Sequence, residues 1–413
     1  MLATVPVPEK RLADYVQAAG EEAVERLREA ARPLHGARLL QLNSTAFGGG
    51  VAELLFTQVA LLNDLGVHTT WAVLEGSDEY FAVTKAVHNA LQGAPVEWTA
   101  QMATTYWDRI VANAAEMPDD YDYYLIHDPQ PAAVIRVVEE EGRRHGRWLW
   151  RCHIDLSTPH APVWEFFEPI VNRYEAAVFT MEDFAQPGVE GPELAFIPPS
   201  IDPLSVKNRS ASEDTTREVL AAYGIDPKRP IVTQVSRFDP WKDPLGVIDA
   251  YRLVKREVPD LQLIMAGSLA SDDPEGMRFL DLTEEHRAGD PDIHLFTNLQ
   301  GVGDLEVSAF QHAADVIVQK STREGFGLVV AEGMWKRKPV VGGNIGGIRL
   351  QIVDGENGFL VDDVESCAAR VSELLRDPHL RERMGAAAHE RIRERFLSLR
   401  ELEDYLRLAA RVT

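Results

Sequence analysis

The chain has 413 residues, too many for one ordinary hydrophobic core, so we expect two domains. Its apolar share of 45% is typical of a folded globular protein, and its net charge of −23 argues against general nucleic-acid binding, which needs a basic field. The apolar runs are too short to cross a membrane, and residues 1–10 lack the pattern of a signal peptide, so we expect a cytoplasmic protein with no membrane partner.

Cysteines and metal-binding motifs are scarce. The two cysteines, Cys152 and Cys367, fall in different expected halves, which indicates no disulfide framework. No Cys/His cluster has the spacing of a zinc site. The isolated pair Asp272-Asp273 stands before a proline and is interpreted as loop. The sequence therefore predicts no metal site.

The first 200 residues alternate apolar strands with helices, the pattern of a parallel α/β sheet. Helical spacing predicts a helix or a helix pair over residues 9–35. The strands are expected at residues 37–43, 68–74, 123–127, 147–154, 176–180 and 194–197, with helices at 51–65 and 80–91. The run Gly48-Gly49-Gly50 follows the first of these strands and can form a phosphate cradle, although a plain tight turn would have the same glycines.

Residues 198–216 are rich in proline and polar side chains and mark the predicted domain boundary. The α/β pattern then resumes. Strands are expected at residues 230–236, 262–266, 293–296, 315–318, 339–341 and 358–361, and helices at 244–257, 308–314 and, with a break near Pro378, 367–412. We therefore predict an α/β protein of two doubly wound, Rossmann-like domains, residues 1–200 and 201–385, with a ligand cleft between them.

The stretch Lys320–Gly347 carries the densest set of potential ligand-binding groups. Its loop holds Glu324 and glycines that let the backbone approach a ligand, and a helix is expected to begin at about Phe326–Leu328. Free N–H groups at a helix start hold phosphates or sugar hydroxyls. A second acid, Glu332, follows eight positions after the first, about two helical turns later. The pattern predicts a ligand that carries both hydroxyls and phosphates.

Two cations, Arg237 and Lys242, follow the strand expected at residues 230–236. The carboxyl end of such a strand faces the ligand crevice, where arginine and lysine can bind a diphosphate. The alternative is a surface loop in which these cations pair with Asp239 and Asp243.

Two further polar residues, Asp128 and His153, end strands in the first half of the chain. A histidine at a strand end is often a satisfied core residue, and an aspartate before Pro129 can simply end its strand in a turn. Both interpretations stay open on the residues alone.

The segment from Glu324 to Glu332 resembles the Glu-seven-residues-Glu signature of retaining GT-B glycosyltransferases, the clan of glycogen synthase and sucrose synthase. Arg237 and Lys242 are similar to that clan's cations on the donor diphosphate, the glycine run to its N-terminal glycine loop, and His153 to its N-domain histidine. A narrower resemblance, to the trehalose glycosyltransferring synthases of glycosyltransferase family four, is carried by residues 42–53, 126–131, 150–155 and 319–327. One departure is Gly333, where the clan more often has alanine.

The resemblance implies a GT-B fold, in which two Rossmann-like domains face each other across a deep cleft and a C-terminal helix, here 386–413, packs back toward the first domain. It implies transfer of glucose from UDP-, ADP- or GDP-glucose to free glucose, giving α,α-trehalose reversibly and with retention. No cofactor or metal is required, the partners are small-molecule substrates, and a homodimer is possible.

The resemblance also implies roles for individual residues. The catalytic set is His153, Arg237, Lys242 and Glu324. The donor-binding set is Gly48, Gly49, Gly50, Gly325, Phe326, Gly327, Leu328, Val329 and Glu332, and the acceptor-binding set is Asp128, Gln130 and Asp155. Glu324 would hold the transferred glucose and Glu332 the ribose.

Other functions remain open on the sequence. The main alternative is another retaining GT-B glucosyltransferase with a sugar-phosphate, glucan or lipid acceptor. A sugar phosphate needs a basic pocket, for which Arg109 and Arg151 are candidates, and a lipid needs a membrane-facing patch of which the acidic first half shows little sign. A sugar-binding protein without catalysis and an isomerase of the epimerase type are the remaining alternatives.

Overall fold

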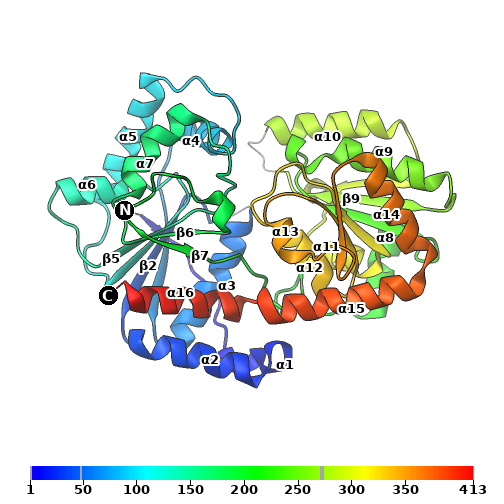
Figure 1. The fold of residues 1–413 in the computed structure, drawn as a ribbon, viewed down its shortest axis with the longest axis horizontal. Coiled ribbons are helices and arrows are strands. Elements are labelled where there is room, and N and C mark those ends of the chain that lie inside the picture. The colour runs from blue at the N-terminus through cyan, green and yellow to red at the C-terminus, as the bar shows by residue number, and fades with distance from the viewer. Residues whose placement is uncertain (1, 47–48, 270–273, 413) are drawn as a thin grey trace. The chain divides into compact units, whose positions relative to one another are not determined.

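Two β-sheets of mostly parallel strands, each with helices on both faces, organise the chain (Figure 1). The structure is a computed structural model that describes residues 2–46, 49–269 and 274–412. The chain divides into unit 1, formed by Met1–Ser200 with Ser398–Thr413, and unit 2, formed by Ile201–Leu397. Each unit has the Rossmann-like α/β architecture that the alternation of strands and helices predicts.

The sheet of unit 1 has seven strands in the order β1-β3-β2-β4-β5-β6-β7, and only β1 runs antiparallel to its neighbour. The strands are β1 (Ala3–Thr4), β2 (Arg38–Asn43), β3 (His68–Val73), β4 (Tyr123–His127), β5 (Arg147–Arg151), β6 (Ala176–Phe179) and β7 (Glu193–Phe196). Central strands such as β4 are buried along their whole length. This explains why they are continuous apolar runs without polar alternation, since helices cover both faces of the sheet.

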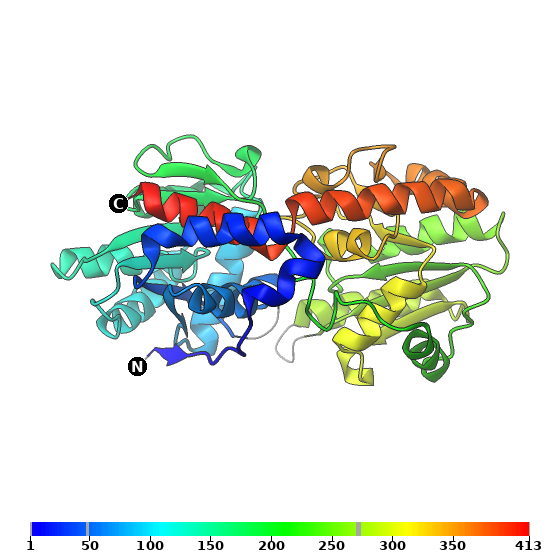
Figure 2. The ribbon, with the colours of Figure 1, turned by 90° about the horizontal axis from the view of Figure 1, so that it is seen from below.

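Two groups of helices cover the sheet of unit 1. One face packs against α4 (Asp78–Leu91), α5 (Ala100–Ala115), α6 (Val134–Glu140) and α7 (Ala161–Val171). The other face packs against α2 (Glu21–Ala31), α3 (Gly50–Asp64) and α16 (Ser398–Arg411). In Figure 2 the last helix, α16, runs beside α2, so the two ends of the chain complete one hydrophobic core.

The sheet of unit 2 has six parallel strands in the order β10-β9-β8-β11-β12-β13. They are β8 (Ile231–Val235), β9 (Gln262–Gly267), β10 (Ile293–Thr297), β11 (Val316–Gln319), β12 (Val340–Gly343) and β13 (Gly358–Val361). One face packs against α9 (Pro244–Lys255) and α14 (Val364–Arg376), and the other against α8 (Glu213–Ala222) and α11 (Asp304–Ala313). Further helices are α1 (Val16–Ala19), α10 (Pro274–Arg287), α12 (Leu328–Trp335), α13 (Ile348–Gln351) and α15 (Pro378–Arg395).

The structure differs from the sequence interpretation at two places that matter for the units. Helix α8 lies partly within the polar stretch 198–216, where Ser212 caps it by accepting a hydrogen bond from the Thr215 amide at 3.0 Å. The segment expected as one C-terminal helix, 386–413, is interrupted between Arg395 and Ser398. Its first part belongs to unit 2 and its second part to unit 1.

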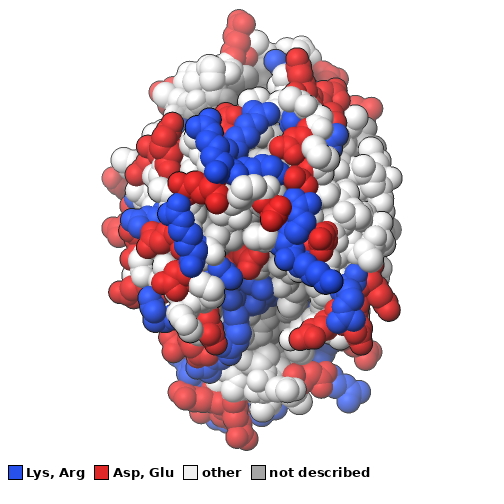
Figure 3. All heavy atoms as spheres, turned by 90° about the vertical axis from the view of Figure 1, so that its right-hand side faces the viewer, with Lys and Arg blue, Asp and Glu red and all other residues white. Residues whose placement is uncertain are grey.

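The surface of the chain carries mixed charge. Figure 3 shows one face, on which Lys and Arg side chains lie interspersed with Asp and Glu. Because the two signs are interspersed, exposed side chains of unit 2 form ion pairs such as Arg376–Glu257 and Arg370–Glu373. Among the described residues, no helix combines the length and apolar character that crossing a membrane requires.

Candidate active site

Two loops of unit 2 meet at one edge of its sheet. Strands β8 and β11 are parallel neighbours, so the loops at their carboxyl ends, residues 236–243 and 320–327, emerge side by side. The Thr322 amide donates to the Trp241 carbonyl at 2.8 Å. The Arg323 guanidinium lies over the Trp241 ring, 5.5 Å from its centre. We call residues 236–243 and 320–327 the donor loops.

A lysine–glutamate pair links the donor loops. Lys242 Nζ lies 2.5 Å from Glu324 Oε2, and these side chains are only 15% and 10% exposed. The Ser321 hydroxyl donates to the same carboxylate oxygen at 3.2 Å. A lysine has three N–H donors, so Lys242 retains donors for phosphate oxygens while Glu324 fixes its position. The structure thus brings together two of the residues for which the resemblance implies a catalytic role.

Four further charged residues of the donor loops form two pairs. Lys320 pairs with Asp243, which also caps α9 by accepting from the Gly246 amide at 3.1 Å. Arg237 pairs with Asp239 at 3.1 Å, as the surface-loop interpretation has it, whereas Lys242 pairs with Glu324 rather than Asp243. The Arg237 side chain is 60% exposed, so it can turn toward a ligand at little cost.

The expected ligand-binding helix start is present at α12. Gly327 caps this helix with φ of 83°, a conformation that favours glycine, and Leu328 and Val329 form its first turn. A Cβ on Gly347 would lie 2.5 Å from the Gly325 carbonyl oxygen and 2.4 Å from Phe326 Cα, so the backbone is packed too closely there for a larger residue. The free N–H groups of this first turn are positioned to hold an anion or a hydroxyl.

The second acid of the signature, Glu332, lies deeper. It is 1% exposed, with Oε1 3.3 Å from Lys207 Nζ, and its Oε2 accepts from Gln311 Nε2 at 3.2 Å. Both carboxylate oxygens therefore contact side chains of unit 2. Any ligand group that reaches Glu332 has to displace one of these contacts.

The glycine run of unit 1 precedes helix α3. Gly49 is the N-cap with φ of 99°, a conformation that favours glycine, and Gly50 is the first helical residue. Gly48, also expected in the donor-binding set, lies outside the described residues. The helix start at Gly49 and Gly50 matches the strand, glycine loop and helix order that the sequence predicts.

Asp128 and His153 lie together at the ends of β4 and β5. The His153 amide donates to Asp128 Oδ1 at 2.8 Å, and the Asp128 amide donates to the Arg151 carbonyl at 2.7 Å. Asp128 has φ of 66°, which few residues other than glycine adopt and which often marks a functional position. Burial raises the pKa of Asp128 to about 6, against the lowering effect of the His153 amide and the Arg151 charge.

The His153 ring contacts two side chains. Its Nε2 lies 2.9 Å from Nδ1 of His127, and Arg151 Nε donates to its Nδ1 at 3.4 Å. Burial and the charge of Arg151 lower the pKa of His127 to about 3 and the pKa of His153 well below its ordinary value. Both imidazoles are therefore neutral at physiological pH.

The other two expected acceptor-binding residues have partners of their own. The Gln130 carbonyl accepts from the Tyr80 hydroxyl at 2.9 Å, and its buried side-chain Oε1 has no hydrogen-bond partner among the described residues. Asp155 is 2% exposed and accepts from the Ser157 amide at 2.8 Å. The contacts therefore join only Asp128 and His153 directly.

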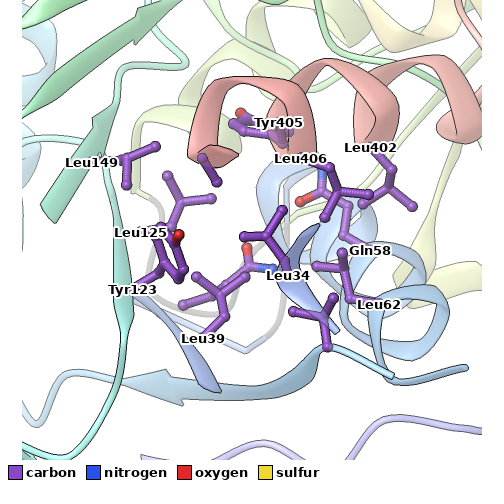
Figure 4. A pocket seen from close by; sticks show the side chains of 13 residues that line it. Leu34, Leu39, Gln58, Leu62, Tyr123, Leu125, Leu149, Leu402, Tyr405 and Leu406 are labelled. Carbon is purple, nitrogen blue, oxygen red and sulfur yellow. The ribbon is translucent and has the colours of Figure 1, made fainter. Parts of the chain in front are cut away.

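An enclosed cavity of about 40 Å³ lies in unit 1 under α16, and it is a packing defect of the core (Figure 4). Most of its lining is apolar, with Leu402 and Leu406 of α16 facing Leu62 of α3. Among its lining residues, only Gln41, Gln58, Tyr123 and Tyr405 have polar side-chain groups. A sugar needs many hydrogen-bonding partners, so this cavity is unsuited to the substrates.

Several residues of the site escape the sequence interpretation. His127, Ser321 and Gln311 contact predicted site residues, and Lys207 contacts Glu332 from the stretch interpreted as a linker. Arg151 was named only as a candidate for a phosphate pocket, and its contact with His153 was not foreseen. His127 could have been found because it directly precedes Asp128. The other contacts depend on the fold.

Metal ligands are not grouped in the part of the chain that the structure describes, where no cluster of three or more His, Cys, Asp or Glu side chains could hold an ion. The pair Asp272-Asp273 lies outside the described residues. Cys152 and Cys367 are buried free thiols in different units.

Two family models match the chain. Residues 41–186 match "Trehalose synthase, N-terminal domain" and residues 215–391 match "Glycosyl transferases group 1". The trehalose synthase of Rubrobacter xylanophilus is 48% identical over 100% of this chain and 99% of its own length. That of Thermococcus litoralis is 46% identical over 97% of this chain and 96% of its own length.

The fold also has solved counterparts. A UDP-forming α,α-trehalose-phosphate synthase from Burkholderia xenovorans, in complex with glucose-6-phosphate, superposes with a TM-score of 0.74 over 91% of this chain and 100% of its own. Its sequence is 14% identical, so this likeness concerns the fold alone. The predicted GT-B class of two Rossmann-like domains is confirmed.

Proposed function

The chain belongs to the trehalose synthase family, and we propose that it joins glucose from a nucleoside diphosphate glucose to free glucose, with retention at the donor's anomeric carbon. It is a trehalose-forming glycosyltransferase, as nearly full-length identity of 45–48% with four curated trehalose synthases supports. The nucleotide, the free-glucose acceptor, retention and reversibility are the parts that we propose.

The observation that carries the donor proposal is the Lys242–Glu324 pair beside the start of α12. One carboxylate, one ammonium and a row of free backbone N–H groups lie at the carboxyl edge of two neighbouring parallel strands. A nucleotide sugar presents the complementary groups, hydroxyls for the carboxylate and phosphate oxygens for the cations.

We assign the diphosphate to the cations of the donor loops. The free N–H groups of Lys242 and the exposed guanidinium of Arg237 neutralise charge that grows on the leaving diphosphate. Glu324 accepts from Lys242 through Oε2, which leaves Oε1 to accept a hydroxyl of the donor glucose. The amides at residues 325–329 hold further donor oxygens. Glu332 holds the ribose hydroxyls in place of its contact with Lys207.

Unit 1 supplies the proposed acceptor groups. Asp128, whose pKa is raised to about 6 by burial, is ionised at neutral pH and orients the acceptor hydroxyl, and we propose Gln130 and Asp155 as further acceptor-binding residues. The helix start at Gly49 and Gly50 offers amides to a phosphate.

Retention follows if the acceptor attacks the face that the diphosphate leaves. The bond from the anomeric carbon to the phosphate oxygen breaks, the bond to the 1-hydroxyl oxygen of the acceptor forms, and the departing phosphate oxygen takes that hydroxyl's proton. The products are trehalose and the nucleoside diphosphate. Catalysis then rests on charge stabilisation and positioning. We propose that the reaction is reversible and that substrate supply sets its direction.

A phosphorylated acceptor is less well supported. Arg151, one candidate for a phosphate pocket, is fully buried and donates to His153. The other, Arg109, is partly exposed and lies on α5, whereas Arg151 lies on β5. Free glucose is therefore the acceptor that we propose. The cytoplasmic location and a homodimer stay predictions.

The proposal is tested with a donor panel. UDP-, ADP- and GDP-glucose are each incubated with glucose or with glucose 6-phosphate, and released nucleotide and sugar products are measured. We expect trehalose and free nucleotide from glucose with at least one donor, and the same reaction to be greatly slowed in Glu324→Gln. Turnover with glucose 6-phosphate alone would contradict the proposed acceptor.

A further inference from the structure

A row of hydrogen-bonded side chains crosses three neighbouring strands of unit 1. Gln41 lies on β2, His127 ends β4, Arg151 ends β5, and His153 follows two residues later. Arg151 Nε lies 3.4 Å from His153 Nδ1, His153 Nε2 lies 2.9 Å from His127 Nδ1, and His127 Nε2 lies 3.0 Å from Gln41 Oε1. The two rings are stacked, with 5.2 Å between their centres.

The direction of these hydrogen bonds follows from the first member of the row. A guanidinium can only donate, so His153 Nδ1 must accept and carries no proton. A neutral His153 then has its proton on Nε2 and donates it to Nδ1 of His127. His127 in turn has its proton on Nε2, where it faces the Gln41 side-chain oxygen, an acceptor. One arginine thus determines both tautomers.

Neither ring is expected to gain a second proton. Burial, together with the nearby charge of Arg151, lowers the pKa of both histidines, that of His127 to about 3. A second proton on His153 would also place an N–H group against the donating Nε of Arg151. The row is therefore stable only with neutral imidazoles in this one arrangement.

The C-terminal helix α16 provides the environment of Arg151. The Arg151 side chain is fully buried, and its two terminal nitrogens have no hydrogen-bond partner among the described residues. Glu401 of α16 is also fully buried and accepts from the Ser200 hydroxyl. Burial raises the pKa of Glu401, while the charges of Arg400 and Arg151 lower it, so this carboxyl group lies within electrostatic reach of Arg151.

A buried guanidinium with two unpaired groups costs stability unless something is gained from its position. The neighbouring positions on the same face of β4 and β5 are occupied by apolar side chains such as Leu125 and Leu149, so a charged residue is unusual in this core. The hydrogen bond from Arg151 to His153 connects this buried arginine to the candidate site.

We propose that Arg151 is a positioning residue for the trehalose-forming reaction, which fixes His153 as a neutral imidazole with its proton on Nε2, while Glu401 of α16 balances the arginine's charge. The inference rests on the proposed function in one respect, the place of His153 beside the reacting sugars. The Nε2 proton of His153 is donated to His127 and its Nδ1 lone pair accepts from Arg151, so His153 has no free lone pair and cannot act as a general base toward a sugar hydroxyl. His153 then contributes by its fixed position, and proton transfer is left to the departing phosphate.

The deciding experiment measures the tautomer in the unchanged, full-length protein. Histidines are labelled with nitrogen-15, and the His153 signals are assigned by their loss in His153→Gln. At pH 7.5 we expect an unprotonated Nδ1 and a protonated Nε2. A proton on Nδ1, or a doubly protonated ring, would overturn the proposal. Because no substrate is present, this result does not depend on which reaction the enzyme catalyses.

Variants connect the tautomer with turnover. Arg151→Met should leave His153 a mixture of tautomers and lower kcat about tenfold, with a much smaller change in KM for the donor. Arg151→Lys keeps a cation and should retain part of the tautomer preference of His153 and part of kcat. Arg147→Met, an exposed residue at the other end of β5, is the matched control and should change neither.

A merely structural role predicts a different outcome. In that case Arg151→Met would lower the melting temperature while the tautomer of His153 and the kcat of the folded fraction stayed unchanged, which would overturn the proposal. If Arg151→Met does not fold, the tautomer of the unchanged protein still decides. Failure to form trehalose with a correct tautomer would instead count against the proposed function.

Discussion

The Lys242–Glu324 pair offers a quantitative test of how the donor loops are held. The two side chains are 15% and 10% exposed, so removal of one partner leaves the other charge nearly buried. Exposed pairs contribute about 0–1 kcal/mol, whereas removal of one partner of a fully buried pair costs about 3–5 kcal/mol. We expect an intermediate loss of about 2 kcal/mol in the free energy of unfolding for Lys242→Met or Glu324→Gln. For a unit the size of Ile201–Leu397, this lowers the melting temperature by about 4–8 °C.

Scanning calorimetry of both single variants and the double variant measures the coupling. The double variant removes both charges, so we expect it to be more stable than the sum of the single losses by about 1–3 kcal/mol. Arg370→Met is the control, because its pair with Glu373 is 43% exposed on both sides and should change stability by less than about 0.5 kcal/mol. Additive losses in the double variant would refute the view that this pair joins the loops. Activity should fall in all three variants of the pair.

The remaining predictions concern the roles of the acids, metals and pH. Glu332→Gln should mainly raise KM for the donor, while Glu324→Gln should also lower kcat. Pure binding defects of equal size in both would contradict the division of roles. EDTA should leave activity intact, because the cations of the donor loops neutralise the diphosphate, and strict loss restored by magnesium would refute this. Asp128 has a folded-state pKa of about 6, above its ordinary 3.8, so kcat/KM for glucose should rise with pH as this carboxyl ionises near pH 6, and Asp128→Asn should remove that rise. His127 has a folded-state pKa of about 3, below its ordinary 6.5, so its contribution to stability is complete above pH 6.5 and is lost as pH falls toward 3. Denaturant titrations of His127→Asn should therefore show a smaller loss of stability in acid than the unchanged protein.

Strand positions follow from the sequence because both sheets are covered on two faces. Runs such as residues 123–127 and 231–235 are mostly apolar and are buried at every position, which is typical of parallel strands covered on both faces. Glycines of the stretch 320–347 were informative for a different reason, since positive φ at Gly327 and the close packing at Gly347 need residues without a side chain. Features of this kind depend on a few neighbouring residues, so the sequence alone predicts them.

The partners of the site residues could not be predicted, because they depend on sheet register and tertiary packing. Gln41, His127 and His153 are separated by 86 and 26 residues along the chain, and only the order β2-β4-β5 brings them into one row. Lys207 stands in a stretch that composition marks as a linker, yet it contacts Glu332. The start of helix α8 in the same stretch was not predicted, because its charged residues resemble those of a solvated linker.

The product of the reaction tests the central claim most directly. The full-length protein is incubated with nucleoside diphosphate glucose labelled with carbon-13 at the anomeric position and with unlabelled glucose, and the products are followed by NMR. We predict that the label moves into the anomeric carbon of α,α-trehalose as free nucleotide is released. Label found only in free glucose, or in a disaccharide of another linkage, would contradict the account.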